Sequence, residues 1–506
     1  MKETYVRKPW VNTARAVKKV QNDRKNIYQV ISLPEKNPSV EKIETRVNKI
    51  DSVKVIQKDE AHDVDTVTIH TKKKEDLKRA EAEPDVVAVI PLPEKKKMGF
   101  SGEIRDQQAF FFAPGEVCPA SQVPRNAAKI DVAGAENVVP SGEGTLIIVW
   151  DFIPNSGSFL DAPEFTDRPG GSITFYPNNS DAFDEHGAQC CSVASGKLAG
   201  IAPGAQLALL GLGNNTVSDL EVIRQVALAF EGPVLVNMSF ALEWRDVDDQ
   251  SLKQSIFDYM DILNQVMYDI IEENPRIMFF VAAGNETQNM CETTEPLTFS
   301  TGNDYYNKII AWPQFARGRS TPYYQVGATS VRQTPPKRQV AVYSNFGPCV
   351  SYFSQGGAIC AYGIYNDQYR AIQGTSFSTP FVAAMAAVLF SQNLNQTADQ
   401  VDSRMRSELG SDTATGAPTL DTTELFLALP LSLDPSVPDV NSPPKKELPV
   451  IEDIMKEPDM DLSAGSPVFD KEKEVPQSLF VILAVCLVGL LLISVYELIR
   501  KPPKKK

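Results

Sequence analysis

Hydrophobic and polar positions follow two different periods along this chain, and these periods divide it into regions. Between residues 145 and 282, runs of consecutive apolar residues alternate with longer stretches in which apolar residues recur every three or four positions. The first pattern predicts buried strands and the second predicts amphipathic helices. Their alternation indicates an α/β fold with a parallel sheet and helices on both faces.

The predicted elements of this central region are strands at 145–151, 233–238 and 276–282, a long helix at 251–273 and a buried helix at 381–390. A further helix is expected to open with the sequence Ser218-Asp219-Leu220-Glu221. This sequence matches a capping box, in which two side chains satisfy N–H groups of the first turn. A region of about 300 residues can bury a large core without disulfides.

The N-terminal region has a different organisation. Residues 1–26 form a basic extension, and 27–93 alternate strand and helix patterns in the order β-α-β-β-α-β. That order is the ferredoxin-like plan of a small α+β domain. Residues 94–115, which include three consecutive lysines, are expected to form an exposed connector. An unrelated small binding domain is the alternative for 27–93.

The C-terminal region predicts a membrane anchor. Residues 431–477 are rich in Pro, Asp, Glu, Lys and Ser, a composition that cannot bury a core and indicates a disordered, flexible stalk. Residues 478–498 are almost wholly apolar and long enough to form one transmembrane helix. A basic tail follows at 499–506. A buried core helix is the alternative for the apolar segment.

The net charge of −14, from 50 basic and 64 acidic residues, argues against nucleic acid as a partner. The chain shows no glycine-rich phosphate loop and no His/Cys spacing typical of a metal site, so no metal site is expected. Its seven cysteines lack an evident pairing pattern. Free thiols are therefore expected, which favours a reducing compartment.

A seven-residue motif, Gly374–Pro380, stands directly before the buried helix predicted at 381–390. The N–H groups at a helix start are unpaired and lie at the positive end of the helix dipole. Ser376 in this position suits a nucleophile whose reaction creates an oxyanion. Pro380 is expected in the first turn, where its missing N–H costs nothing. The alternative is a Ser/Thr N-cap on an ordinary core helix.

A hydroxyl nucleophile usually needs a neighbouring base, and the chain has three histidines. Since His62 and His70 lie in the small N-terminal domain, His186 is the only imidazole that the central region offers. The residues that follow His186 predict a short helix ending at Gly196. For a lone histidine, a structural role is the alternative.

Two predicted strands end in polar residues. Asp151 follows the apolar run 145–150, and Asn285 follows the apolar run 279–283. Functional groups in open α/β sheets gather at the carboxyl ends of the strands. Asp151 can orient a histidine, and the Asn285 amide can donate a hydrogen bond to developing negative charge. The alternatives are ordinary turn residues.

Taken together, these residues resemble the subtilisin-like serine peptidases. The order Asp151, His186, Asn285 and Ser376 matches that family's order of acid, base, oxyanion donor and nucleophile. The motif Gly374–Pro380 is the family's serine motif in full. The resemblance implies a catalytic domain at 116–430 that hydrolyses protein or peptide substrates through an acyl-enzyme.

The resemblance also implies how substrate binds. Residues 236–239 resemble the strand that pairs with bound substrate. Ser239, Phe240, Ala241 and Gly284 are the expected substrate-binding residues. No cofactor is implied as a requirement. The family often binds structural calcium through loop oxygens, and such sites are not legible in one sequence.

The N-terminal domain resembles the inhibitory propeptide of the same family. Such a propeptide assists folding, and its C-terminal tail lies in the active site until the connector is cut. Residues 27–93 would then be an intramolecular inhibitor, and the chain would be made as a zymogen. Processing is expected within the connector.

The chain departs from the family's pattern at three places. Phe152 follows Asp151, where the family usually has Ser or Thr, and Ala188 replaces a usual threonine. These departures alter the support of Asp151 without touching the triad side chains. Phe240-Ala241 stands where Leu-Gly is common, which puts the substrate groove in doubt.

The sequence therefore predicts a membrane-anchored serine endopeptidase made as a zymogen. A non-catalytic, membrane-tethered binding protein on a decayed protease fold is the alternative, and a permanently latent protease is a third possibility. Two rules conflict on the membrane side. Cations after the span place the C-terminus in the cytoplasm, whereas the missing signal peptide leaves the protease in the compartment of synthesis. The second rule gives a slight lean to a cytoplasmic catalytic domain.

Overall fold

The structure is a computed structural model, and the residues it describes lie within one compact unit, Trp10–Met455. The described residues are 27–32, 40–50, 52–61, 64–83, 86–92, 94–97, 117–118, 141–153, 157–176, 184–213, 215–245, 250–287, 297–299, 308–311, 323–333, 336–347, 350–357, 359–364, 367–411 and 419–420. The regions predicted at 1–26, 431–477, 478–498 and 499–506 lie outside them. In the described part, no helix is both long and apolar enough to cross a membrane.

A small α+β domain begins the described chain. Its elements are β1 (Ile27–Ser32), α2 (Val40–Val47), β2 (Lys54–Ala61), β3 (Val64–His70), α3 (Lys74–Glu81) and β4 (Val86–Pro91). The strands lie in the order β2-β3-β1-β4 and all neighbours are antiparallel. Val30 and Val67 of the sheet share a hydrophobic cluster with Ile43 of α2. The expected β-α-β-β-α-β order is therefore present.

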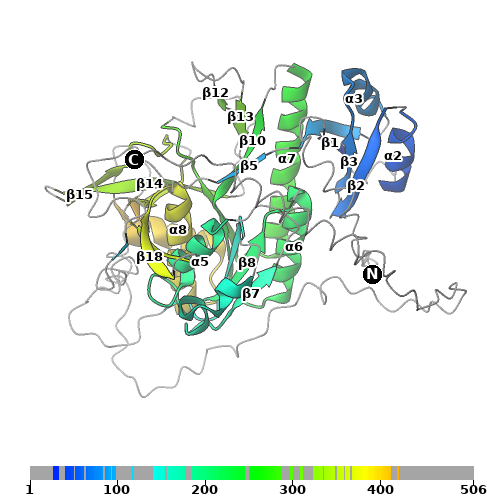
Figure 1. Cartoon of the computed structure of the whole chain (residues 1–506). Coiled ribbons are helices and arrows are strands. Elements are labelled where there is room, and N and C mark those ends of the chain that lie inside the picture. The colour runs from blue at the N-terminus through cyan, green and yellow to red at the C-terminus, as the bar shows by residue number, and fades with distance from the viewer. Residues whose placement is uncertain are drawn as a thin grey trace, which may run out of the picture. The chain divides into compact units, whose positions relative to one another are not determined.

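The central sheet contains seven neighbouring strands that run parallel. In order they are β16 (Tyr352–Gln355), β14 (Tyr324–Gln333), β11 (Ile277–Ala282), β9 (Val234–Met238), β6 (Leu146–Asp151), β8 (Gln206–Gly211) and β7 (Ile173–Tyr176). Two short strands, β20 (Thr419–Leu420) and β19 (Gly410–Ser411), continue beyond β16, and β15 (Pro336–Val340) pairs with β14. The parallel α/β sheet predicted from the sequence is confirmed (Figure 1).

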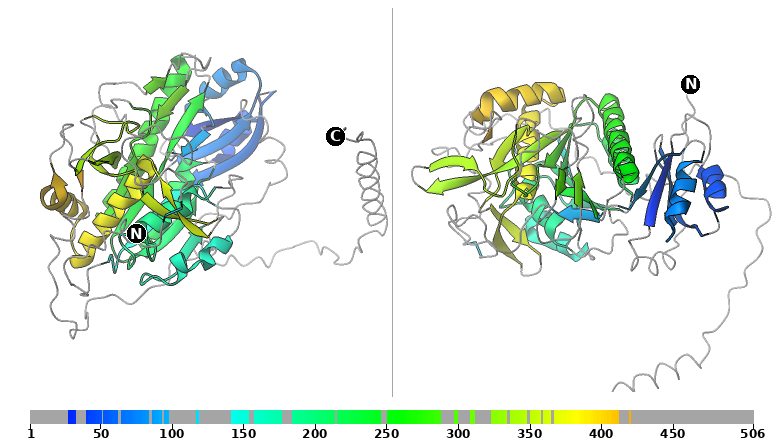
Figure 2. Two further views of the ribbon diagram at one scale, coloured as in Figure 1. Left: turned by 60° about the vertical axis from the view of Figure 1, so that its left-hand side comes forward. Right: turned by 90° about the horizontal axis from the view of Figure 1, so that it is seen from above.

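Helices cover both faces of this sheet. The long helices are α5 (His186–Ser195), α6 (Thr216–Ala229), α7 (Gln250–Glu273) and α8 (Thr375–Gln392). Successive residues of a strand point to opposite faces of the sheet. Ile148 and Trp150 of β6 therefore lie in one hydrophobic core with α6 and α7. Ile147 and Val149 lie in a second core with α5 and α8. Figure 2 shows α7 and α8 on opposite sides of the sheet. A strand buried on both faces needs the unbroken apolar run found here.

Helix α6 starts earlier than the sequence predicts. Its N-cap is Asn215, whose side chain accepts a hydrogen bond from the Val217 N–H at 3.0 Å. The predicted capping box at 218–221 is therefore wrong, because Ser218 already lies inside the helix. Asp219 points into the core instead, where its Oδ2 accepts a hydrogen bond from Trp150 Nε1 at 3.2 Å. A tertiary partner thus overrides the local motif.

The small sheet is apolar on its second face as well. Ile31 and Ile90, which alternate with the residues that face α2 and α3, belong to the same hydrophobic cluster as Tyr259 of α7. Strand β4 is in contact with α7. The small domain therefore buries one sheet face under its own helices and the other against the central domain.

A second antiparallel sheet joins the two domains through a strand. Its order is β12 (Leu297–Phe299), β13 (Lys308–Ala311), β10 (Phe240–Arg245) and β5 (Glu94–Lys97). In the register of β10 and β5, Phe240 lies opposite Lys97 and Leu242 lies opposite Lys95. Residues 94–97, expected within an exposed connector, thus form an edge strand.

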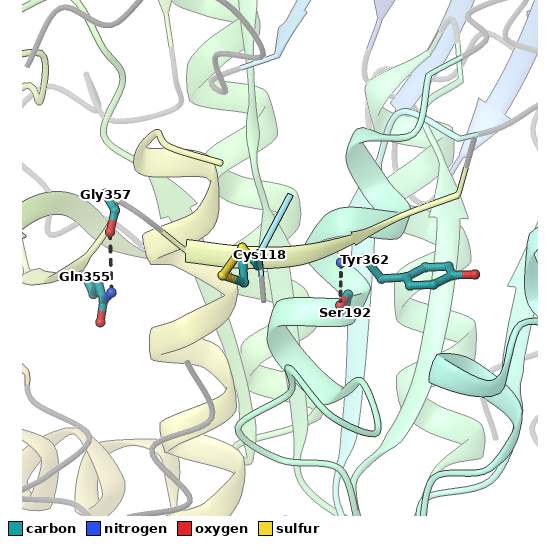
Figure 3. Close-up of a disulfide and its surroundings, with 6 residues drawn as sticks. Cys118, Ser192, Gln355, Gly357 and Tyr362 are labelled. Atoms are coloured by element: carbon teal, nitrogen blue, oxygen red, sulfur yellow. Dashed lines mark hydrogen bonds between the residues drawn. A yellow bond between two sulfur atoms is a disulfide. The ribbon is translucent and has the colours of Figure 1, made fainter. Parts of the chain in front are cut away.

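A disulfide corrects the expectation of free thiols for two cysteines. Cys118 is bonded to Cys360 across a sequence separation of 242 residues (Figure 3). Cys360 lies in the hairpin of β17 (Ile359–Gly363) and β18 (Gln368–Ile372), and the Cys118 N–H donates to the Tyr369 carbonyl at 2.9 Å. The spacing of two cysteines so far apart carries no pairing signal, so the sequence did not predict this bond.

Breaking this disulfide should lower stability. A cross-link between distant residues restricts the unfolded chain, and native disulfides contribute about 2–5 kcal/mol. We expect the double variant Cys118→Ser/Cys360→Ser to lose that much free energy of unfolding, measured by urea denaturation without reductant. A reductant should shift the wild-type protein to the midpoint of the variant and leave the variant unchanged. Equal midpoints without reductant would contradict the prediction.

Candidate active site

The acid and the base of the predicted triad are in direct contact. Asp151 ends β6, and His186 is the first residue of α5. The His186 Nδ1 atom lies 2.7 Å from Asp151 Oδ1, and both side chains are buried. The Phe152 N–H also donates to Oδ1, at 2.6 Å. A backbone donor thus fixes the carboxylate in the plane where it meets the imidazole.

This contact determines the roles of the two ring nitrogens. A carboxylate oxygen only accepts hydrogen bonds, so Nδ1 carries the proton that it donates to Asp151. In the neutral form of the imidazole, Nε2 then bears the lone pair. Nε2 is buried and has no hydrogen-bond partner among the residues that the structure describes. An unprotonated, unpartnered Nε2 is the form that a general base requires.

Ser376 lies in the first turn of α8, which packs directly against α5. The helix begins after Gly374, whose φ of +141° is rarely accessible to residues with a side chain. The ring of Phe377 lies 5.3 Å from the His186 ring, measured between centroids. The starts of the two helices therefore bring the predicted base and nucleophile to the same place.

The Ser376 hydroxyl does not bond to the imidazole in this conformation. Its Oγ donates to the Ser239 carbonyl at 3.0 Å. Rotation about one side-chain bond redirects a serine hydroxyl, and contacts of this kind often form only with substrate bound. The structure thus contains the Asp151–His186 half of the predicted chain of hydrogen bonds.

Pro380 lies deeper in α8 than the sequence predicts. The helix spans Thr375–Gln392, which puts Pro380 past the first turn. Its missing N–H leaves the Ser376 carbonyl, four residues earlier, without its helical donor. Two side chains replace that donor, with Ser239 Oγ at 2.8 Å and Cys190 Sγ at 3.6 Å. The expectation that the missing N–H costs nothing is wrong, and these two contacts offset the loss.

Asn285 is anchored to the start of the same helix. Its Oδ1 accepts hydrogen bonds from the Thr375 N–H at 3.0 Å and from Thr375 Oγ1 at 3.1 Å. The Gly284 N–H donates to the same Thr375 hydroxyl at 3.2 Å. The turn that carries Asn285 is thus tied to the residue before Ser376. The two contacts of Oδ1 set the orientation of the Asn285 side chain, and its amide Nδ2 lies on the edge opposite Thr375.

Asn345 is a positioning residue that the sequence did not reveal. Its Nδ2 donates to the Ala283 carbonyl at 2.8 Å and to Glu286 Oε2 at 2.7 Å, and its Oδ1 accepts from the Glu286 N–H at 3.0 Å. These contacts bracket Gly284, whose φ is +101°. Nothing in the local sequence around Asn345 shows which distant loop it holds.

The expected substrate-binding residues have different surroundings. Ser239 contacts the nucleophile's residue, as described above. Phe240 is fully buried and its ring packs on Trp150, with centroids 4.9 Å apart, so its side chain belongs to the core. Ala241 is also buried. Phe240 and Ala241 can therefore meet a substrate only through their backbone.

Most of the segment expected to pair with substrate, residues 236–239, lies in a strand that has no free edge. Residues 234–238 form β9, which is paired on both sides by β6 and β11 and has no edge to offer. The available ladder belongs to β10, the next strand, which pairs with β5. Substrate pairing near Ser239 stays a prediction, and β10 is the strand whose ladder could carry it.

One cluster of three groups in the described part of the chain could hold a metal ion: Asp151, His186 and Cys190. The 2.7 Å between Asp151 Oδ1 and His186 Nδ1 is a hydrogen-bond length. Two ligands on a tetrahedral zinc, each about 2.1 Å from the ion, would lie about 3.4 Å apart. The cluster therefore fits an acid–base pair with a neighbouring thiol better than a metal site.

Comparisons with known proteins agree with this geometry. "Alkaline serine exoprotease A" of Vibrio alginolyticus is 25% identical over 259 residues, which is 50% of this chain and 40% of that relative. "Subtilase-type proteinase RRT12" of Saccharomyces cerevisiae is 26% identical over 257 residues, 48% of this chain and 43% of that relative. The matched segment thus spans less than half the length of either relative.

A solved structure shows the same fold. The epidermin leader peptide processing serine protease (EpiP) of Staphylococcus aureus superposes with a TM-score of 0.53 at 14% identity, covering 79% of this chain and 97% of that one. The sequence model of the subtilase family, Peptidase_S8, matches residues 117–423, which is more than half of the chain and includes every predicted triad residue. The chain belongs to the subtilase family.

Proposed function

We propose that the protein is a serine endopeptidase that hydrolyses peptide bonds in proteins or peptides. The observation that carries this proposal is the buried Asp151–His186 pair beside the start of α8, where Ser376 lies. Membership of the subtilase family supports it. In this proposal Ser376 is the nucleophile, His186 the base and Asp151 the group that holds the imidazole tautomer.

The proposed reaction runs through an acyl-enzyme. His186 Nε2 takes the proton of Ser376 Oγ as that oxygen bonds to the carbonyl carbon of the substrate. The carbonyl oxygen becomes an oxyanion, stabilised by the Asn285 amide and the Ser376 N–H. The C–N bond then breaks, and His186 gives its proton to the leaving amine. Water repeats the sequence, which releases the acid product and restores the serine.

A non-catalytic binding protein on a decayed protease fold is the competing proposal. It would leave the buried Asp151–His186 contact without a purpose, and burying a carboxylate is costly. We therefore favour the enzyme. Structural calcium stays an expectation.

We further propose that the small N-terminal domain is an inhibitory propeptide and that the chain is a zymogen. The pairing of β5 with β10 supports this, because it occupies the sheet edge next to Ser239. The two strands are antiparallel, so moving from Phe240 back to Ser239 moves β5 forward beyond Lys97. Strand β5 therefore runs toward Ser239 in the direction expected for the acyl side of a substrate.

The register also supports a particular processing bond. The Ser239 carbonyl accepts a hydrogen bond from the Ser376 hydroxyl at 3.0 Å, so a residue that continued the ladder opposite Ser239 would present its carbonyl to the nucleophile. Counting forward from Lys97, that residue is Met98, which lies outside the described residues. We propose cleavage of the Met98–Gly99 bond. Lysines then fill the second to fourth positions before the cut, which implies that basic segments are accepted there.

We also propose that residues 478–498 anchor the protein in a membrane. Their length and apolar composition support this. The Cys118–Cys360 disulfide favours an oxidising compartment for the protease domain, since disulfides are rare in reducing ones. This argument opposes the lean towards the cytoplasm and agrees with the cations that follow the span.

Replacement of Ser376 tests the proposed activity. We expect Ser376→Ala to lose labelling by a fluorophosphonate probe and to lower peptide hydrolysis by at least about 10⁴-fold, because no hydroxyl remains for His186 to activate. Ser378→Ala is the matched control, since its buried hydroxyl in the same motif donates to the Ser354 carbonyl at 3.3 Å. Labelling that persists in Ser376→Ala, or that maps to another serine, would contradict the proposal that Ser376 is the nucleophile.

An insertion tests the processing bond. In wild-type protein, N-terminal sequencing should find a new end at Gly99, absent in Ser376→Ala. With one extra Met inserted after Lys97, the register predicts cleavage after the inserted residue, so the new end begins Met-Gly. Recognition of the Met-Gly sequence alone would again give an end at Gly. An end at Gly99 in the insertion variant would refute control by the β5–β10 register.

Replacement of Asn345 tests the support of the oxyanion site. A single oxyanion donor is worth about 10²–10³-fold in this family, so Asn285→Ala should lose that much kcat. We expect Asn345→Ala to lose about ten- to hundredfold, because it releases the turn around Gly284 without removing the donor. The control is Asn274→Ala, another buried asparagine, which donates to the Ala227 carbonyl at 3.3 Å. Equal losses in Asn345→Ala and the control would contradict a positioning role.

A further inference from the structure

A buried thiol lies against the acid–base pair and has no part in the proposed reaction. Cys190 follows His186 by four residues on α5, so both side chains lie on the same face of that helix. Cys190 is fully buried. The Cys190 Sγ, an Asp151 carboxylate oxygen and a His186 ring nitrogen all lie within 4.8 Å of one another.

The carboxylate beside this thiol has an unsatisfied oxygen. Asp151 Oδ1 accepts hydrogen bonds from His186 Nδ1 and the Phe152 N–H, whereas Oδ2 is buried with no partner among the described residues. A buried carboxylate oxygen without a donor is costly, and such groups are rare. The next residue, Phe152, carries no hydroxyl, although family members usually have Ser or Thr at this position.

The thiol is able to serve as the missing donor. Burial, followed by the negative charge of Asp151, raises the pKa of Cys190 well above that of an ordinary thiol. Cys190 therefore keeps its proton at neutral pH and has one S–H to donate. It lies 3.6 Å from the Ser376 carbonyl, which Pro380 leaves without a helical donor.

We propose that Cys190 is a positioning residue of the triad. Its thiol proton is shared between Asp151 Oδ2 and the Ser376 carbonyl, and this contact couples the acid at the end of β6 to the nucleophile at the start of α8. The proposal rests on the peptidase activity proposed above and assigns no covalent chemistry to sulfur.

The neighbouring cysteine offers a matched control. Cys191 is equally buried on the same helix and, like Cys190, is a free thiol. Burial raises the pKa of Cys191, the charge of Arg168 acts to lower it, and the charge of Asp151 acts to raise it. Replacing either cysteine by alanine removes the same atom from the same core. Only Cys190 contacts the Ser376 carbonyl.

The test compares Cys190→Ala, Cys190→Ser and Cys191→Ala in the full chain. The readout is the saturable rate of fluorophosphonate labelling of Ser376, which separates the maximal rate from the half-saturating concentration. We expect Cys190→Ala to lower the maximal rate roughly tenfold or more, since a hydrogen bond to a charged group is lost, with half-saturation unchanged. Cys190→Ser should recover most of the rate because its hydroxyl donates to the same acceptors. Cys191→Ala should label at the wild-type rate.

Thermal unfolding of each variant separates this role from general packing. Cys190→Val, which fills the space without a donor, replaces Cys190→Ala if the latter fails to fold, and it should be equally slow. A wild-type rate in either donor-free variant, or the same loss in Cys191→Ala, would overturn the positioning role while leaving the peptidase intact. A wild-type protein that neither labels nor hydrolyses peptides would overturn both proposals.

Discussion

The packing of α5 against α8 on one face of the parallel sheet is the constraint on which the rest of this structure depends. Both helices are buried along nearly their whole length, and their first turns carry His186 and Ser376. Small side chains let the two helix starts approach closely, and β6 delivers Asp151 to the same edge of the sheet. The site is therefore a product of core packing, and its geometry is as rigid as the core that supports it.

Much of this architecture is legible in the sequence because it follows from local periodicity. The apolar run before Asp151 and the helix after His186 occupy the predicted places, whereas the buried helix predicted at 381–390 begins earlier, at Thr375. Parallel strands then force their carboxyl ends to one edge, so residues far apart in sequence become neighbours. The small domain was predictable for the same reason, since its strands and helices alternate with clear periods.

The features that the sequence did not reveal are contacts between residues that lie far apart in the chain. Cys118 forms a disulfide with Cys360 across most of the central region, and Asn345 hydrogen-bonds to the turn around Gly284. Pro380 removes a helical hydrogen bond that Ser239 and Cys190 restore from other elements. No spacing in the chain encodes such pairings, because they exist only after the sheet and helices have assembled. The residues proposed to carry the chemistry were therefore predictable from the sequence, whereas the residues that position them were not.

The Cys118–Cys360 bond encloses almost everything that the site needs. The segment between the two cysteines includes Asp151, His186 and Asn285, and Ser376 follows shortly after it. If the protease nicks its own backbone anywhere inside this loop, the two fragments stay covalently joined. The damaged molecule gains only the mass of one water for each cut, and its pieces stay at high effective concentration. Self-digestion of the central domain would therefore go unseen until the sulfur–sulfur link is opened.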